Sequence, residues 1–77
     1  MAKQEPTAVE KRMGIPGERY VMQPERKNPF GGQIYRLILA SSPFDMIDMF
    51  FDSPMEVDIY ALGRGLIVVE KFDEEKQ

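Results

Sequence analysis

Apolar residues gather in the second half of the chain. About half of residues 33 to 77 are apolar, whereas residues 1 to 32 hold most of the prolines and glycines, which interrupt regular elements. Nothing in residues 1 to 17 repeats at a helical or strand period. This pattern predicts a mobile N-terminal tail over residues 1–17 and a single small domain over residues 18–77, with its core in residues 33–72.

Two segments before residue 41 have the composition of strands. Residues 33 to 40, QIYRLILA, are rich in β-branched and aromatic side chains and end at a Ser-Ser-Pro sequence, which predicts a strand. Residues 19 to 23, RYVMQ, favour a short edge strand that ends before Pro24. Residues 24 to 32 carry turn-forming and basic residues and are predicted to form a loop, with Phe30 packed onto the domain as an anchor.

A helix is predicted in the middle of the chain. Ser42 fits an N-cap, Pro43 fits the first turn because it needs no donor there, and Asp45 favours the positive end of the helix dipole. Pro54 would end this helix. At the helical period, the apolar residues of the segment fall on one face and the acidic residues on the opposite face, beside Met49.

Two further strands are predicted after Pro54. Residues 55 to 61 alternate between apolar and polar side chains, as a half-exposed strand does. Residues 66 to 72, LIVVEKF, are predicted to form the second strand. Between them, Gly63 and Gly65 can take the positive φ angles of a tight hairpin turn. The sequence therefore predicts a β-hairpin in this part of the chain.

Together these elements predict an α+β fold: a small three- to four-stranded, mostly antiparallel sheet with one amphipathic helix, in β-α-β-β order, behind a flexible N-terminal segment. A helix of about 10 residues is roughly 15 Å long and covers only one face of the sheet. The other face would leave an apolar patch in water, which predicts that it is buried between copies of the chain, as a homodimer or higher oligomer. The residues of this expected oligomer interface are Ile34, Ile38, Tyr60, Ile67 and Val69.

The composition excludes several kinds of chemistry. The 77 residues include no histidine and no cysteine, which removes imidazole bases, thiolates and the usual ligands of zinc and iron–sulfur sites. We therefore expect no metal, no cofactor and no enzymatic activity. No apolar run approaches the about 18 residues that span a bilayer, and the N-terminus does not resemble a signal peptide. The expected location is the cytoplasm, without membrane contact.

Charge divides within the chain. The net charge is −3, with an excess of basic residues up to Arg36 and an excess of acidic residues after it. The preferred prediction is a non-catalytic small protein-interaction module that self-associates through its sheet and presents an acidic helix face to a protein partner with a basic patch. That face comprises Asp45, Asp48, Met49 and Asp52. A solvated face without a partner, or a carboxylate site for a metal or for catalysis, would explain the same acidic residues.

The main alternative is a regulatory nucleic-acid-binding protein that uses the basic and aromatic N-terminal segment. Basic side chains beside aromatic rings are typical of grooves for single strands, and here they are Arg19, Tyr20, Arg26, Lys27, Phe30 and Arg36. The acidic net charge opposes this interpretation, and a linker pinned to the sheet by its aromatic side chains explains the same residues. A third hypothesis is a small-molecule or enzymatic pocket between subunits, lined by Tyr35, Tyr60 and acidic residues.

Overall fold

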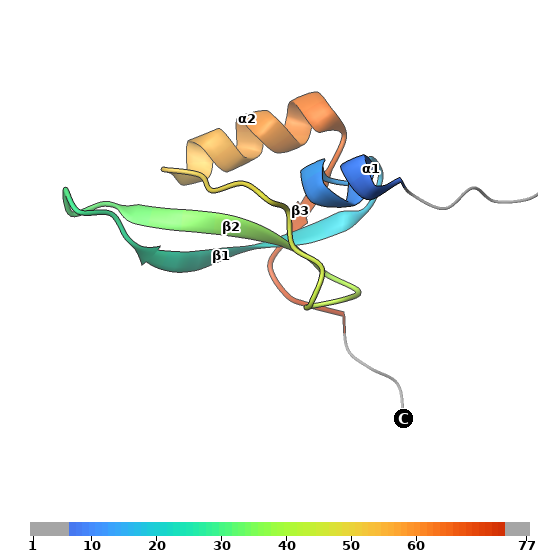
Figure 1. The fold of residues 1–77 in the computed structure, drawn as a ribbon, viewed down its shortest axis with the longest axis horizontal. Coiled ribbons are helices and arrows are strands. Elements are labelled where there is room, and N and C mark those ends of the chain that lie inside the picture. The colour runs from blue at the N-terminus through green and yellow to red at the C-terminus, as the bar shows by residue number, and fades with distance from the viewer. Residues whose placement is uncertain (1–6, 74–77) are drawn as a thin grey trace, which may run out of the picture.

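Residues 7–73 are described by the computed structural model, in which two helices accompany a small sheet (Figure 1). The three strands lie in the order β2-β1-β3, with β1 antiparallel to β2 and parallel to β3. A mixed sheet with helices confirms the predicted α+β class. In chain order the elements are α1 (Ala8–Met13), β1 (Arg19–Lys27), β2 (Gln33–Leu39), α2 (Pro54–Arg64) and β3 (Ile67–Val69).

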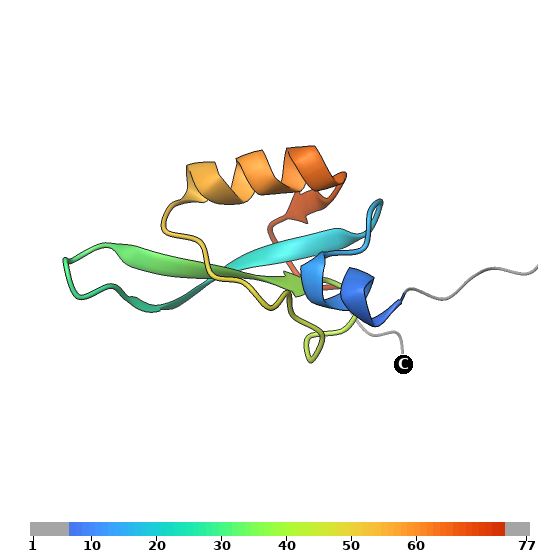
Figure 2. The ribbon, with the colours of Figure 1, turned by 45° about the horizontal axis from the view of Figure 1, so that its top comes forward.

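The core lies between the sheet and α2, which covers one face of it (Figures 1 and 2). Val57 and Ala61 lie one helical turn apart and form the buried side of α2. Opposite them, Tyr20 of β1 and Leu37 of β2 are almost completely buried. The whole buried cluster comprises Tyr20, Leu37, Leu39, Ile47, Phe51, Val57, Ala61 and Leu66.

Helix α2 lies where the sequence predicted a strand. Ser53 is its N-cap, with a side chain that accepts a hydrogen bond from the backbone amide of Glu56 at 3.2 Å, and Pro54 occupies the first turn. Gly65 ends the helix at φ 83°, a left-handed conformation that glycine adopts without strain. The strand prediction for residues 55–61 is therefore wrong, because caps at both ends select the helix despite the alternating side chains.

The segment between β2 and α2, residues 40–53, begins with turns and then runs along the edge of β2, where the sequence predicted a helix. The amide of Tyr35 donates to the carbonyl of Phe51 at 2.8 Å, and the amide of Phe51 donates back at 2.9 Å. Nearer the start of the segment, the amide of Ile47 donates to the carbonyl of Leu37 at 2.9 Å. The helix prediction is wrong because pairing with the open edge of β2 satisfies these backbone groups instead.

The two remaining strands also differ from their predictions. β3 is shorter than the strand predicted over residues 66–72, and it pairs in parallel with β1 because residues 55–61 are helical and offer no hairpin partner. β1 is the central strand, and it continues through Pro24 to Lys27. Pro24 has no backbone N–H group to donate, so it fits where a strand has no neighbour. β3 pairs only with residues 19–21 of β1, which leaves that edge of β1 free at Pro24, and a bulge follows Pro24 on the side of β2.

α1 lies in the segment that the sequence assigned to a mobile tail. The carbonyl of Met13 accepts a hydrogen bond from the hydroxyl of Tyr60, and the carbonyl of Gly14 accepts one from Nε of Arg64 at 2.9 Å. These two bonds attach the end of α1 to α2. Residues 1–6 of the predicted tail lie outside the described residues, so the boundary between tail and domain stays a prediction.

The sheet face away from α2 is covered in part by the chain itself. After β3 the chain runs back past the sheet (Figure 1), and the amide of Asp73 donates to the carbonyl of Ala40 at 2.9 Å. The Asp73 carboxylate also pairs with Arg19 at 2.6 Å. Val21 and Ile38, whose side chains point to this face, are buried. The expected open apolar face is therefore smaller than the sequence indicated.

Candidate functional site

The outer side of α2 carries a row of exposed apolar side chains. Met55, Ile59 and Leu62 follow one another at spacings of four and three residues, so they lie on one side of the helix. Their side chains are 69, 64 and 86% exposed, on the side opposite the buried Val57 and Ala61. α2 is therefore apolar both toward the sheet and toward solvent, a pattern typical of helices that contact a partner.

A hollow continues this row toward α1. It has a volume of about 370 Å³, enough for a large apolar side chain, and is lined by Met13, Ile59, Tyr60, Gly63 and Arg64. Apart from the chain neighbours of Gly63 and the backbone of α2 itself, no atom of the described residues lies within 4 Å of the position that a Cβ atom on Gly63 would take, so this side of the hollow is open. We call the row and the hollow together the outer α2 surface, comprising Met13, Met55, Ile59, Leu62 and Gly63.

Charged residues border the outer α2 surface. At 3.6 residues per turn, Glu56 and Asp58 flank the apolar row on opposite sides, and both are exposed. Glu56 lies on the side of the hollow, where its carboxylate also accepts a hydrogen bond from the amide of Asp52 at 3.3 Å. Arg64 is also among the residues that line the hollow, and its Nε donates to the carbonyl of Gly14. The surface thus has an apolar centre with acidic flanks and one basic group.

A second exposed cluster lies at the β1–β2 hairpin, which extends past the N-terminal end of α2 (Figure 2). Phe50, from the segment beside β2, is 48% exposed. The guanidinium carbons of Arg36 and Arg26 lie 4.4 and 5.3 Å from the centroid of its ring, within the range of cation–π contacts. Because side chains alternate along β2, Arg36 lies on the sheet face opposite Leu37 and away from α2.

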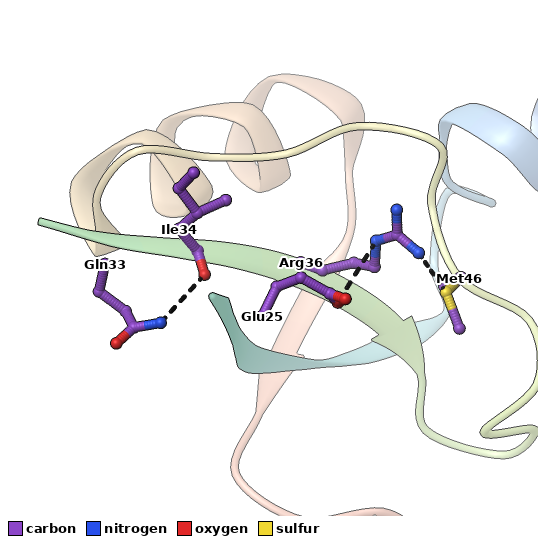
Figure 3. Close-up of polar contacts among 5 residues, drawn as sticks. All are labelled: Glu25, Gln33, Ile34, Arg36 and Met46. Atoms are coloured by element: carbon purple, nitrogen blue, oxygen red, sulfur yellow. Dashed lines mark hydrogen bonds and ion pairs between the residues drawn. The ribbon is translucent and has the colours of Figure 1, made fainter. Parts of the chain in front are cut away.

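Arg36 is held between neighbouring groups (Figure 3). Its Nε atom lies 3.9 Å from a carboxylate oxygen of Glu25, and its Nη1 donates to the sulfur of Met46. The side chain is only 18% exposed, and the buried Nε has no hydrogen-bond partner among the described residues. The guanidinium group is therefore fixed against Phe50 and keeps hydrogen-bonding capacity that the protein does not use.

The tip of the hairpin projects Phe30 into solvent. The amide of Asn28 donates to the carbonyl of Gly32 at 2.7 Å, and the side-chain oxygen of Asn28 accepts from the amide of Phe30 at 2.6 Å, which closes the turn. Phe30 is 95% exposed, so the prediction that it anchors the loop on the domain is wrong. We call the exposed groups of this region the hairpin surface, comprising Arg26, Lys27, Phe30, Arg36 and Phe50.

The six residues proposed for nucleic-acid contact do not all lie together. Arg19 pairs with Asp73 at the other end of β1. Tyr20 is buried, and its hydroxyl oxygen accepts a hydrogen bond from the amide of Ile15 at 2.9 Å. Burial raises the pKa of Tyr20. The four that the structure does place on the hairpin are Arg26, Lys27, Phe30 and Arg36.

The residues of the predicted acidic helix face do not lie on a helix. All lie in residues 40–53, where the structure has no helix, and Asp45 falls in an exposed turn. Met49 packs against the core, and the Asp48 carboxylate lies 4.0 Å from Nε of Arg12. Asp52 precedes the start of α2, where a negative charge favours the helix. The helix that was predicted to present these residues is absent, and a partner-binding role for the residues themselves stays a prediction.

The five residues of the expected oligomer interface are also separated. Tyr60 lies on α2, beside α1, whereas the other four lie on the sheet. On the sheet, Ile38 is buried and Ile67 is 49% exposed. Ile34 and Val69 are partly buried. Self-association stays a prediction, but the patch proposed for it is divided between two layers of the fold.

Sequence reasoning missed the outer α2 surface and the role of Phe50. A signal for the helix exists, because Ser53-Pro54-Met55-Glu56 repeats the capping pattern seen at Ser42-Pro43-Phe44-Asp45 and Gly65 supplies a C-cap. No local signal identifies Phe50, since only the pairing of residues 40–53 with β2 brings it to Arg36.

The outer α2 surface and the hairpin surface are composed of apolar, aromatic and charged side chains. Within residues 7–73, no three acidic side chains gather closely enough to hold a metal ion. No helix in that part of the chain is both long enough and apolar enough to cross a membrane. Compared with known proteins, the chain matches no family model, no curated protein and no solved structure.

Proposed function

We propose that the chain is a non-catalytic protein-interaction module that self-associates through the outer α2 surface. The observation that carries this proposal is the row of Met55, Ile59 and Leu62, each of which is more than 60% exposed. Contiguous exposed apolar surface of this kind is typical of interaction sites. The lack of histidine and cysteine in the sequence supports a role without catalysis.

The row is complementary to itself. Met55 and Leu62 lie seven residues apart, on either side of Ile59 along the helix. If two α2 helices pack antiparallel about a two-fold axis, Met55 faces Leu62 of the partner subunit, and the two Ile59 side chains meet near the axis. Every apolar side chain in the row then has an apolar partner, which is why a second copy of the chain fits this surface.

The charges that flank the row act in opposite directions in this arrangement. Glu56 lies on the side of the hollow, and the antiparallel pairing brings it toward Arg64 of the partner subunit, so that these charges attract. Asp58 lies on the other side, close to the two-fold axis, so the two Asp58 carboxylates repel each other. The apolar contacts therefore carry the association, and the charges adjust its strength.

The expected dimer is weak. Burying one large apolar side chain contributes about 1.5–3 kcal/mol, so six of them contribute on the order of 10 kcal/mol. This gain is similar to the about 4–15 kcal/mol that association costs in lost freedom of motion. We therefore expect a dimer that forms at high protein concentration and dissociates on dilution.

Sedimentation velocity over a range of concentrations tests the proposal. For the wild type, the mean mass is expected to rise from one chain toward two as the concentration increases. Leu62→Asp places a charge at the most exposed position of the row and is expected to keep the chain monomeric. The matched control is Phe44→Asp, because Phe44 is 91% exposed and lies outside the outer α2 surface.

Two results would contradict the proposal. One is a wild-type chain that remains a monomer at every concentration reached. The other is a Leu62→Asp chain that dimerises as strongly as the wild type while its circular dichroism spectrum is unchanged. Loss of dimers in both Leu62→Asp and the Phe44→Asp control would place the interface elsewhere and also count against it.

A further inference from the structure

We infer that the hairpin surface is a binding site for single-stranded nucleic acid. This inference is independent of self-association, because it rests on a different part of the fold. It starts from the ring of Phe50, which is half-exposed and has the guanidinium groups of Arg36 and Arg26 within 4.4 and 5.3 Å of its centroid. Sites for single strands combine two components, aromatic rings on which bases stack and cationic groups that contact the backbone phosphates.

Arg36 supplies a fixed part of this site. Its guanidinium group is oriented by Glu25 and Met46, and its side chain is only 18% exposed (Figure 3). A group held in this way loses little freedom when a ligand binds. Because the ring of Phe50 lies against it, a base that stacks on Phe50 extends an aromatic and guanidinium stack that already exists in the free protein.

Arg26 and Lys27 supply the contacts to phosphate. Both are exposed at the end of β1, and neither forms an ion pair within residues 7–73. On the β1–β2 hairpin, from residue 20 to residue 36, the chain carries three basic side chains, Arg26, Lys27 and Arg36, and one acidic side chain, Glu25. The hairpin surface is therefore locally positive even though the net charge of the chain is −3, so phosphate attraction is restricted to this region.

Phe30 adds a second aromatic group at the tip of the hairpin. It is 95% exposed and sits in a turn closed by Asn28, so its position follows that of the hairpin. An acidic peptide would use the basic groups but has no need for two exposed rings, whereas every nucleotide offers both a phosphate and a flat base. The combination therefore favours a single strand with unpaired bases.

Fluorescence anisotropy with a labelled oligodeoxythymidine of about 20 nucleotides tests this inference, since one such site covers about 4–16 nucleotides. We expect binding at low salt that weakens with added salt, with a log–log slope between about −1.4 and −2, because two or three phosphates are neutralised at about −0.7 each. A duplex of the same length should bind at least about tenfold more weakly, because its bases are stacked within the helix.

Matched substitutions separate stacking from charge. Phe50→Ala is expected to weaken binding about five- to hundredfold, the loss of one stacked base, and Phe30→Ala should weaken it in the same direction. Phe44→Ala is the aromatic control, since Phe44 is 91% exposed, about as much as Phe30, but follows the other end of β2. Lys27→Glu should weaken binding and flatten the salt slope, whereas Lys71→Glu, at the far end of the chain, should do neither.

Several outcomes would overturn the inference. They are no binding of the single strand at low salt, equal binding of the duplex, and binding by Phe50→Ala and Phe30→Ala that equals the wild type. Phe30→Ala is the decisive variant if Phe50→Ala alters the fold, because a residue that is 95% exposed contributes little to packing. An equal loss in the Phe44→Ala control would also count against a site on the hairpin.

Discussion

The hydroxyl oxygen of Tyr20 accepts a hydrogen bond from the backbone amide of Ile15 at 2.9 Å. Tyr20 is only 2% exposed, so this bond joins the segment after α1 to the core of the sheet. Burial raises the pKa of Tyr20 above its ordinary value of 10.0. The bond from Ile15 acts in the opposite direction, and the negative charges of Glu18 and Asp45 raise the pKa further.

This shift predicts a loss of stability at alkaline pH. Folded Tyr20 holds its proton more tightly than the unfolded chain does, so its contribution to the free energy of unfolding is complete below pH 10 and is lost as the pH rises above that value. We expect the free energy of unfolding of the wild type, measured with urea, to fall more steeply above pH 10 than that of Tyr20→Phe. The variant also leaves the Ile15 amide without an acceptor, at a cost of about 1 kcal/mol at neutral pH. If the free energy of unfolding depends on pH in the same way for both chains, the raised pKa of Tyr20 is contradicted.

Two serines that precede prolines should respond differently to substitution. Ser53 caps α2, so Ser53→Ala is expected to lower the free energy of unfolding by about 1 kcal/mol. Ser42 occupies the same place in a similar sequence but precedes no helix, so Ser42→Ala should change it by less than about 0.5 kcal/mol. Urea titration of both variants measures the two changes. An equal loss in the free energy of unfolding would contradict a stabilising role for the capping hydrogen bond of Ser53.

Two glycines near the end of α2 should have opposite effects. Gly65 has a φ of 83°, so Gly65→Ala is expected to destabilise the fold by about 1–2 kcal/mol. Gly63 lies within the helix, where nothing would obstruct a Cβ atom, so Gly63→Ala should stabilise it by about 0.5–1 kcal/mol. Thermal unfolding of the two variants, compared with that of the wild type, shows whether each substitution raises or lowers the stability. Destabilisation by Gly63→Ala would indicate that this position is not helical.

Neutralising Asp58 distinguishes a second copy from a basic protein partner. In the antiparallel dimer the two Asp58 carboxylates repel each other, so Asp58→Asn is expected to lower the dissociation constant about two- to fivefold. Sedimentation equilibrium measures the change, with Glu70→Gln as the control because Glu70 is exposed outside α2. If α2 instead binds a protein with a basic patch, Asp58→Asn removes an attractive charge and should weaken that binding. A dimer of Asp58→Asn that is weaker than the wild-type dimer, or equal to it, would contradict the proposed pairing.

The fold class and β2 could be predicted from the sequence because they depend on local composition. The segment from residue 33 to residue 40 is strongly β-forming, and β2 covers Gln33–Leu39. The helix and the following strand could not be assigned correctly, because Ser42-Pro43 and Ser53-Pro54 both fit the start of a helix. The apolar residues after each pair do not by themselves decide between a helix and an extended segment. Two features decide between them: the open edge of β2, which is a tertiary property, and the C-cap at Gly65.

The hairpin surface was only partly predictable for a similar reason. Arg26, Lys27 and Arg36 are close in sequence and form a recognisable basic group. Phe50 lies 14 residues beyond Arg36, and it reaches the guanidinium group only because residues 40–53 run along β2. Phe30 was expected to pack onto the domain, but the turn at Asn28 directs it into solvent. Contacts between distant segments are not encoded in local pattern.

Disulfide cross-linking tests the antiparallel pairing of α2 most directly, because the native chain contains no cysteine. A chain with Met55→Cys and a chain with Leu62→Cys are mixed in equal amounts and oxidised, and the covalent dimers are identified by mass. Random pairing would make half of the covalent dimers mixed, so the account predicts that clearly more than half contain one chain of each kind, because Met55 faces Leu62 of the partner subunit. A preponderance of self-linked dimers, or no more cross-linking than in a Ser41→Cys control, would contradict it.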